Sequence, residues 1–180
     1  IARAFASGIK NGGDFDQGAS TITQQLIKNN VLTSWTSETS FIEKLQRKIQ
    51  EQYLSLELEK QVDKNWIIEN YMNSINLGAN TLGVQAASEK YFNKDVSELT
   101  LSECAVIAGI TQNPALYNPI THPDQNAKRR KKVLENMKEQ NYITKAQFDE
   151  AMADDVYSRI AEYNSSNTTS VNSYFVDALI

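Results

Sequence analysis

Residues 40–61 read SFIEKLQRKIQEQYLSLELEKQ, and this stretch decides the fold class of the chain. Ser40 stands three positions before Glu43, which is the spacing of a capping box at the start of a helix. Apolar side chains then recur at helical spacing, at Phe41, Leu45, Ile49, Tyr53 and Leu56. The pattern predicts one long helix whose apolar stripe, from Phe41 to Leu56, belongs to the core.

The same signals recur along most of the chain, and sustained strand alternation is nearly absent. Three further capping boxes occur, at Thr21/Gln24, Thr100/Glu103 and Thr144/Gln147. We therefore expect a mainly α fold, with helices at residues 1–11, 22–30, 40–61, 64–73, 83–91, 100–109, 124–140 and 144–153. Turns are predicted where glycine, asparagine and proline gather, at residues 11–13, 77–80 and 113–123.

Composition limits the class of protein. The 180 residues, 41% of them hydrophobic and 22% charged, suffice for one domain with a sizeable core. A net charge of −4 argues against general nucleic-acid binding. The single Cys104 and the single His122 exclude an internal disulfide and a multi-histidine metal site, and we interpret Cys104 as a buried small hydrophobe and His122 as a loop residue. No apolar run reaches the roughly 18 residues that a bilayer span needs.

The first segment with chemical potential is QGASTITQQLIKN, residues 17–29. Its small residues allow close backbone approach, its hydroxyls and amides supply donors, and the start of a helix offers free N–H groups to an anion. Such a segment suits a phosphate or a sugar. The alternative is an ordinary helix cap whose glutamines and lysine face solvent. The Gly-Lys-Ser/Thr ending of a nucleotide-binding Walker loop is absent.

The second segment lies within the long helix, where three cations and one carboxylate share a face. Lys44, Arg47, Lys48 and Glu51 stand at positions i, i+3, i+4 and i+7. The cations could hold a diphosphate, and an ionised Glu51 could orient them or a metal. The alternative is a solvated helix face with weak ion pairs, and this segment alone favours that alternative.

Taken together, these segments resemble glycosyltransferase family 51, found in class A penicillin-binding proteins and monofunctional peptidoglycan polymerases. Residues 18–29 look like the family's second motif, and residues 47–51 (RKIQE) look like its third. Residues 64–73 (KNWIIENYMN) are similar to the fourth motif and residues 129–134 (RRKKVL) to the fifth. The order and spacing also fit, and similar segments lie between the motifs, at residues 86–92, 99–103 and 108–114.

The resemblance implies a mainly α, lysozyme-like fold in which a large lobe and a smaller membrane-proximal lobe flank a cleft. It also implies the reaction, in which a sugar 4-hydroxyl attacks the anomeric carbon of a lipid-linked glycan and expels lipid diphosphate with inversion. On the family's pattern Glu51 is the second essential glutamate. The substrate-binding residues would be Ser20, Thr21, Gln24, Gln25, Lys28, Lys44, Arg47 and Lys48. A divalent metal, Mg²⁺ or Mn²⁺, is compatible with the diphosphate, but no residue is assigned as its ligand. Glu69, Asn73 and residues 129–134 are interpreted as structural.

Two departures from the family's pattern qualify the transfer. The family's first motif, which carries the general base, would lie immediately before Ile1, so we interpret the chain as N-terminally truncated and expect it to be inactive by itself. In the third motif, Gln50 replaces a lysine that many relatives carry, and Lys44 stands in for an arginine. Glutamine offers a hydrogen bond without charge, so the family's phosphate contacts do not transfer in full.

Three other functions remain as alternatives. A lysozyme-like hydrolase would share the helical fold and a catalytic glutamate, but it would cleave glycan with water and would not need the Gln-Gln-x-x-Lys and Arg-Lys segments. A degenerate helical module would keep the core without polymerising anything. A helical nucleic-acid binder fits the acidic balance least.

The resemblance also sets the expected organisation and partners. Residues 1–163 would form the glycosyltransferase domain, and residues 164–180, rich in Ser, Thr and Asn before an apolar end, would be a linker and the start of a following region. The expected partners are lipid II, the growing glycan strand, the bacterial membrane through an N-terminal anchor outside this chain, and a C-terminal transpeptidase domain in the parent protein. The expected location is the extracytoplasmic face of the cytoplasmic membrane.

Overall fold

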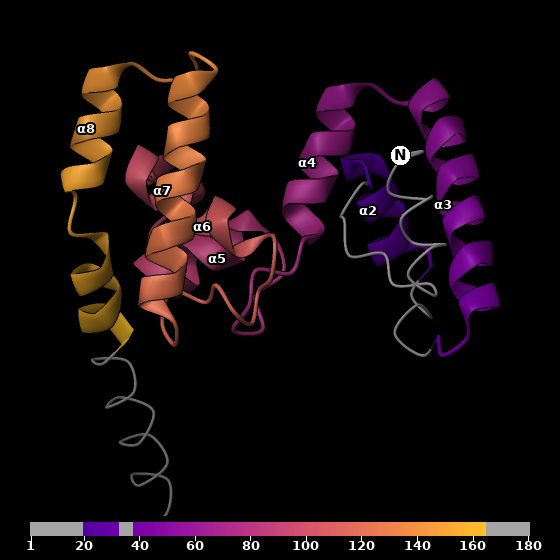
Figure 1. The fold of residues 1–180 in the computed structure, drawn as a ribbon, viewed down its shortest axis with the longest axis horizontal. Helices are drawn as coiled ribbons and strands as arrows, with labels where there is room; N and C mark the ends of the chain where they lie inside the picture. Colours follow the sequence, from indigo (N-terminus) through magenta and orange to yellow (C-terminus); the bar gives the residue numbers. More distant parts are fainter. Residues whose placement is uncertain (1–19, 33–37, 165–180) are drawn as a thin grey trace, which may run out of the picture. The chain divides into compact units, whose positions relative to one another are not determined.

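The computed structural model describes residues 20–32 and 38–164, and the fold in these ranges is helical (Figure 1). Its only pairing outside helices is an isolated antiparallel bridge between Asn76 and Leu82 within the described ranges. The mainly α prediction is confirmed. The helices are α2 (Ile22–Asn30), α3 (Phe41–Gln61), α4 (Lys64–Ser74), α5 (Val84–Phe92), the 3₁₀ helix η2 (Val96–Glu98), α6 (Leu101–Ile110), α7 (Pro123–Glu139) and α8 (Lys145–Ala153). Residues 156–164 are also helical.

The predicted helix boundaries hold to within one residue for the seven helices that can be compared, and the helix predicted at residues 1–11 lies outside the described ranges. The four capping boxes form, with side chain and backbone bonded reciprocally in each. Sequence patterns missed η2 and the helix at 156–164. Asp95 is the N-cap of the short η2, and its carboxylate accepts the backbone N–H of Ser97 at 2.9 Å.

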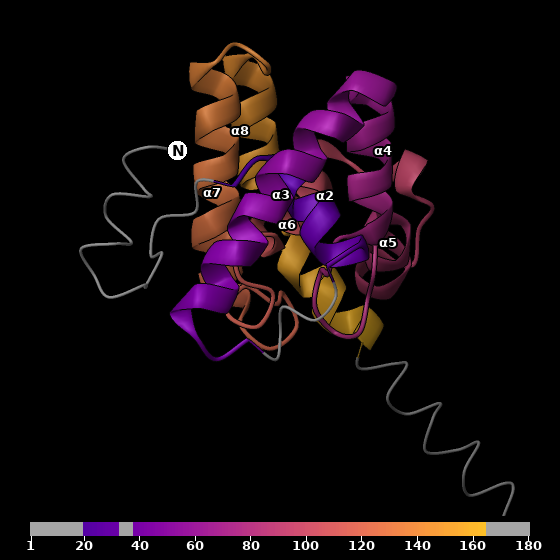
Figure 2. The same cartoon turned by 90° about the vertical axis from the view of Figure 1, so that its right-hand side faces the viewer.

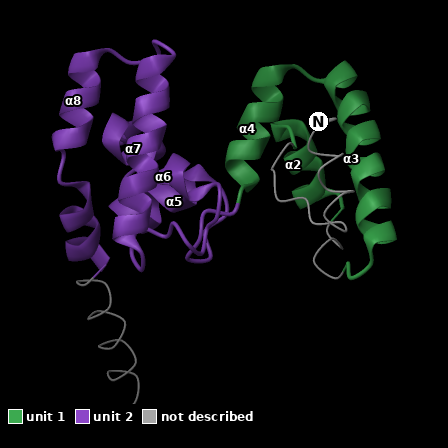
Figure 3. Cartoon of the chain, in the orientation of Figure 1, with its two compact units in different colours: residues 1–75 green, residues 76–180 purple. Residues whose placement is uncertain are grey.

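The described chain falls into two compact units, residues 1–75 and residues 76–180 (Figure 3). In the first unit, α2 packs against both α3 and α4. Leu26 and Ile27 of α2 and Ile67 of α4 are buried in its core. Polar bonds add to this packing. The Thr23 hydroxyl donates to Glu59 at 2.5 Å, and the Gln24 amide donates to Gln52 at 3.0 Å, so α2 is tied to α3 at two points.

The apolar stripe of α3 does not form part of the core, and the prediction that it does is wrong. Ile49 and Tyr53 are 61% and 63% exposed, and Phe41 and Leu56 are exposed as well. The buried residues of this helix are instead Glu51 and Ser55. Helical periodicity shows that a face is apolar, but it does not show which face the neighbouring helix covers. Here α2 covers the polar face.

In the second unit, α6 is the central helix and packs against α5, α7 and α8. It is apolar around most of its circumference, as a helix with neighbours on several sides should be. The helices α7 and α8 run side by side (Figure 2). Ala105 of α6 and Leu134 of α7 belong to one buried apolar cluster. Val106 of α6 packs with Val156 and Ile160 in a second cluster.

The turn predicted at residues 77–80 is present and is held by a buried hydrogen bond. The Tyr91 hydroxyl donates to the Leu77 carbonyl at 2.7 Å, and burial raises the pKa of Tyr91 to about 12. Gly78 has a φ of +78°, and a Cβ there would lie 3.0 Å from the Pro114 carbonyl oxygen. Glycine is therefore required at this position both for its backbone conformation and for its small size.

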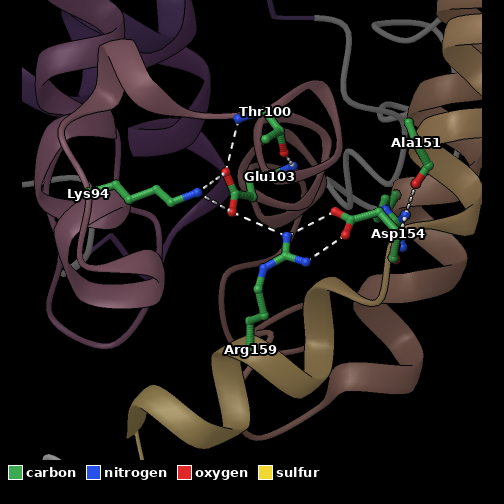
Figure 4. Close-up of polar contacts among 7 residues, drawn as sticks. Lys94, Thr100, Glu103, Ala151, Asp154 and Arg159 are labelled. Carbon is green, nitrogen blue, oxygen red and sulfur yellow. Dashed lines mark hydrogen bonds and ion pairs between the residues drawn. The ribbon is translucent and has the colours of Figure 1, made fainter.

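A charged cluster around Glu103 joins three segments of the second unit (Figure 4). Lys94 Nζ lies 2.9 and 3.0 Å from the two carboxylate oxygens, and Arg159 approaches one of them at 3.3 Å. The Thr100 backbone N–H also donates to the carboxylate, at 2.9 Å. Arg159 is in turn bonded to Asp154 through both of its terminal nitrogens. Burial alone would raise the pKa of Glu103, but these donors outweigh it and lower the pKa.

No described helix combines the length and the apolar character needed to cross a bilayer.

Candidate functional site

The candidate site is centred on Glu51, a buried carboxylate in the middle of α3. Its side chain is 1% exposed, and each of its oxygens accepts a hydrogen bond from a different cation. Arg47 NH1 binds one oxygen, and Lys48 Nζ binds the other at 2.6 Å. Helix geometry places these partners three and four residues before Glu51 on the same face. The shared face predicted from spacing is therefore confirmed for these three residues.

The start of α2 adds a hydroxyl and a further cation to this cluster. Lys48 Nζ donates to the Ser20 hydroxyl at 3.1 Å while it also holds Glu51. Burial is the largest cause that lowers the pKa of Lys28; the charges of Lys48 and Arg47 lower it further, and Glu51 opposes them. Lys28 therefore interacts electrostatically with the cluster, and the Ser20–Lys48 hydrogen bond joins the start of α2 to the site on α3.

Of the other predicted substrate-binding residues, Thr21, Gln24 and Gln25 make contacts within the first unit, and Lys44 makes no salt bridge to any described residue. Thr21 caps α2, and Gln24 completes that capping box while its amide reaches Gln52. Gln25 accepts a long hydrogen bond, 3.4 Å, from the Tyr71 hydroxyl. The capping box thus sets where Ser20 and Lys28 lie, rather than offering its own side chains.

Glu38 belongs to the cluster and was missed from sequence. Both of its carboxylate oxygens lie 2.8 Å from Arg47 Nε, and the two side chains are 13% and 14% exposed. Burial alone would lower the pKa of Arg47, but hydrogen bonds to Glu38 and Glu51 outweigh it and raise the pKa. Glu38 precedes the helix and lies nine residues before Arg47, so no helical spacing connects the two.

Cys104 and His122 were also interpreted from the sequence, and the structure agrees only with the interpretation of His122. Cys104 is exposed, so its interpretation as a buried hydrophobe is wrong. The reason is that α6 buries its other faces, which leaves this position at the surface. Desolvation and, to a lesser degree, the Glu103 carboxylate raise the pKa of the thiol, which disfavours the nucleophilic thiolate. His122 precedes α7 and is exposed, in agreement with its interpretation as a loop residue.

The segment similar to the fifth motif has a structural role at Arg130. This side chain is buried, donates to the Ala151 carbonyl and lies 5.7 Å from the centre of the Tyr157 ring. Glu69 and Asn73, also interpreted as structural, are exposed and make no side-chain hydrogen bond to the described part of the chain. Gln50 is likewise exposed, so it supplies neither charge nor contact at the Glu51 cluster.

The arrangement suits the binding of a phosphate better than the binding of a metal ion. Arg47 and Lys48 both bind Glu51, their charges act on Lys28, and charge-assisted N–H donors are strong ligands for phosphate oxygens. A cation held by Glu51 would have to displace Arg47 or Lys48 from its oxygens. Nowhere in residues 20–32 and 38–164 do three or more His, Cys, Asp or Glu side chains gather as metal ligands. The residues present therefore do not fit a metal held by the protein itself.

Comparison with known proteins gives a consistent result. The model of a family described as "Transglycosylase" matches residues 1–138. Penicillin-binding protein 1A of Clostridium botulinum, strain Langeland, is 49% identical over 77% of this chain and 16% of that protein. Penicillin-binding protein 1A of Clostridium novyi is 42% identical over 99% of this chain and 20% of that protein.

A solved structure is similar as well. The crystal structure of penicillin-binding protein 1A from Haemophilus influenzae matches with a TM-score of 0.50 and 41% identity, over 52% of this chain and 14% of that one. The chain thus spans about a fifth or less of the length of the relatives quoted.

Proposed function

Because the chain belongs to the transglycosylase family, we propose that it is the part of a peptidoglycan glycosyltransferase that binds lipid-linked disaccharide and polymerises it. The fold is the mainly α, lysozyme-like fold of that family. The observation that carries the proposal is the Glu51 cluster, where a buried carboxylate is bound by Arg47 and Lys48 and interacts electrostatically with Lys28. A solvated helix face would not bury its carboxylate.

The proposed reaction is an inverting transfer from lipid II. The 4-hydroxyl oxygen of the acceptor sugar forms a bond to the anomeric carbon of the growing chain, and the bond from that carbon to the lipid diphosphate breaks. Negative charge gathers on the leaving diphosphate, and fixed cations stabilise it most in a site shielded from water. We assign this role to Lys48 and Lys28. Ser20 orients Lys48 through the hydrogen bond between them.

The hydroxyl proton requires a carboxylate base, and we do not assign that task to Glu51. Its two oxygens are already engaged by Arg47 and Lys48, so we assign Glu51 to holding these cations in place. We assign the base to a residue upstream of Ile1, as the family resemblance implies. On this proposal the 180-residue chain by itself binds substrate without polymerising it.

The test is polymerisation of lipid II by this chain and by the same chain extended upstream through the family's first motif. The extended chain should make glycan, and Glu51→Gln should reduce the rate roughly a hundredfold or more. Glu57→Gln is the matched control, because Glu57 is on the same helix but its side chain is 40% exposed and pairs only with Lys60 in the described part. Glu57→Gln should retain the rate.

Three results would contradict parts of this proposal. If the folded, extended chain makes no glycan and binds no lipid II, the polymerase proposal fails and a structural module becomes the better explanation. Shortening of preformed glycan without polymerisation would instead indicate a hydrolase. If the 180-residue chain polymerises unaided, the assignment of the base to an upstream residue is wrong.

The proposal extends to the membrane. We propose that the exposed apolar side chains of α3, among them Ile49 and Tyr53, lie against the outer leaflet of the cytoplasmic membrane, where the lipid-linked substrate resides. Vesicles of phosphatidylethanolamine and phosphatidylglycerol should retain the chain in a sedimentation assay, and Ile49→Ser with Tyr53→Ser should release it. Tyr142→Ser, at an exposed position of the second unit, is the control and should leave the chain bound. If the vesicles retain the α3 double variant as well as they retain Tyr142→Ser, α3 is not the contact.

The parent protein is also a proposal. The relatives quoted are several times longer than this chain and are named as penicillin-binding proteins. From this we infer a parent that carries a transpeptidase domain after the glycosyltransferase part and an anchor before it.

A further inference from the structure

We propose that Glu38 is a positioning residue for Glu51 and acts through Arg47, so that Arg47 supports the carboxylate while Lys48 is the cation left to meet the phosphate. This inference rests on the proposed function of the Glu51 cluster. It assigns different tasks to two neighbouring cations that sequence patterns treat as equivalent.

The geometry of Arg47 supports the first half of the proposal. Its guanidinium lies between two carboxylates, with Nε bonded to both oxygens of Glu38 at 2.8 Å and NH1 bonded to Glu51. A guanidinium is rigid and planar, so a partner that fixes the Nε edge also fixes the direction of the terminal nitrogens. Glu38 therefore determines where NH1 meets the Glu51 carboxylate.

Burial makes this arrangement effective. The side chains of Glu38 and Arg47 are both mostly buried, which reduces screening by solvent and restricts alternative rotamers. Glu38 lies two residues before Ser40, the N-cap of α3, where Ser40 and Glu43 form a capping box. The long arginine side chain is thus held at both of its donor edges, and Glu51 is held in turn.

Arg47 and Lys48 differ in the charges of their partners. Two carboxylates offset the single charge of Arg47, which leaves it little attraction for a phosphate. Lys48 shares Glu51 with Arg47, but it also donates to the neutral Ser20 hydroxyl, and its side chain is the more exposed of the two. A phosphate can therefore replace the hydroxyl on Lys48 at low cost, whereas on Arg47 it would have to displace a buried carboxylate.

The kinetic test uses the chain extended upstream, with lipid II as substrate. Glu38→Ala should lower kcat roughly tenfold to a hundredfold and change KM by less than about threefold, because the misplaced group is not a substrate contact. Glu38→Gln should retain more of kcat, since its amide oxygen still accepts from Arg47 Nε. In an Arg47→Lys background, which lacks the Nε donor, Glu38→Ala should have little further effect.

Glu43→Ala is the matched control for the helix start. It removes the Glu43 side chain from the capping box, which begins at Ser40 two residues after Glu38, and it leaves the Glu38 and Arg47 side chains unchanged. If Glu43→Ala lowers kcat as much as Glu38→Ala does, Glu38 only supports the helix start and the proposal is wrong. Additive effects of Glu38→Ala and Arg47→Lys would also overturn it, as would a rise in KM without a change in kcat.

A second readout does not depend on activity. In the 180-residue chain, the Nε–H proton of Arg47 should be protected from solvent exchange in NMR spectra, and Glu38→Ala should abolish this protection while Glu43→Ala preserves it. If Glu38→Ala leaves the signal unchanged, the positioning contact does not exist. If the signal responds as expected but the extended chain neither polymerises nor binds lipid II, the proposed function fails, and with it the role of Glu38 in catalysis.

Discussion

Glu51 in the first unit and Glu103 in the second have similar immediate surroundings. Each is a glutamate within a helix, each side chain is 1% exposed, and each carboxylate is bound by two cations. Their partners differ in origin. Arg47 and Lys48 come from the same turn of the same helix as Glu51, whereas Lys94 and Arg159 lie nine residues before and 56 residues after Glu103.

This difference separates two uses of a buried charge. Partners within one helix are brought together by the helix itself, so the ion pairs of Glu51 with Arg47 and Lys48 join no separate segments and add little to tertiary stability. The Glu103 cluster joins a loop, α6 and the helix at 156–164, and its loss would release all three (Figure 4). A buried carboxylate with local partners is therefore the better candidate for function, and one with distant partners is the better candidate for structure.

The largest effect that tests this comparison is on stability. Glu103→Gln should lower the free energy of unfolding by about 1–3 kcal/mol, because two cations lose their charged acceptor. Glu51→Gln should change it by less than about 1 kcal/mol, while in the chain extended upstream it should reduce the polymerisation rate roughly a hundredfold or more. Urea unfolding followed by far-UV circular dichroism measures both variants.

Tryptophan fluorescence assigns the loss to a unit. Both tryptophans of the sequence fall within residues 1–75. The Glu103→Gln transition should therefore shift in circular dichroism more than in fluorescence. Equal losses of stability for Glu51→Gln and Glu103→Gln would show that it does not matter whether the cations come from the same helix as the glutamate or from distant segments.

A smaller effect is expected in acid. The pKa of Glu103 is lower in the folded chain than its ordinary value of 4.5. A carboxyl group of this kind contributes stability above its unfolded pKa, and the contribution is lost as the pH falls below 4.5 toward the folded value. Urea midpoints measured between neutral and acidic pH should drop in this range, and they should drop less in Glu103→Gln. An equally steep drop in that variant would assign the acid sensitivity to other carboxylates, such as Asp154, whose pKa is also lowered, chiefly by its bond to Arg159.

The smallest effect is expected at an exposed local pair of the second unit. Lys145 and Asp149 lie at i and i+4 on α8, 2.5 Å apart, and both are exposed. Asp149→Asn should change the free energy of unfolding by less than about 0.5 kcal/mol, because solvent screens such pairs. A larger loss in urea unfolding would mean that charges anywhere in the second unit are critical, and that the distant partners of Glu103 are not what matters.

Features encoded within a few residues were predictable. The capping boxes and the helix boundaries depend on contacts between residues three or four apart, and these contacts formed as expected. The pairing of Arg47 and Lys48 with Glu51 follows from the same geometry. Features that depend on a neighbouring element were not predictable. The stripe of α3 was assigned to the core, and Cys104 was assigned to the interior, because periodicity does not reveal which face is covered.

The sequence by itself determined that this chain is helical, where most helices begin and end, and to which family it is similar. Capping, periodicity and motif order are local properties that the chain carries before it folds. Only the tertiary structure decided that α2 packs on the polar face of α3, which buries Glu51 and brings Ser20 to Lys48. It also decided that Glu38 returns to Arg47, because a contact between a connecting segment and a helix depends on the path of the chain, which no spacing rule encodes.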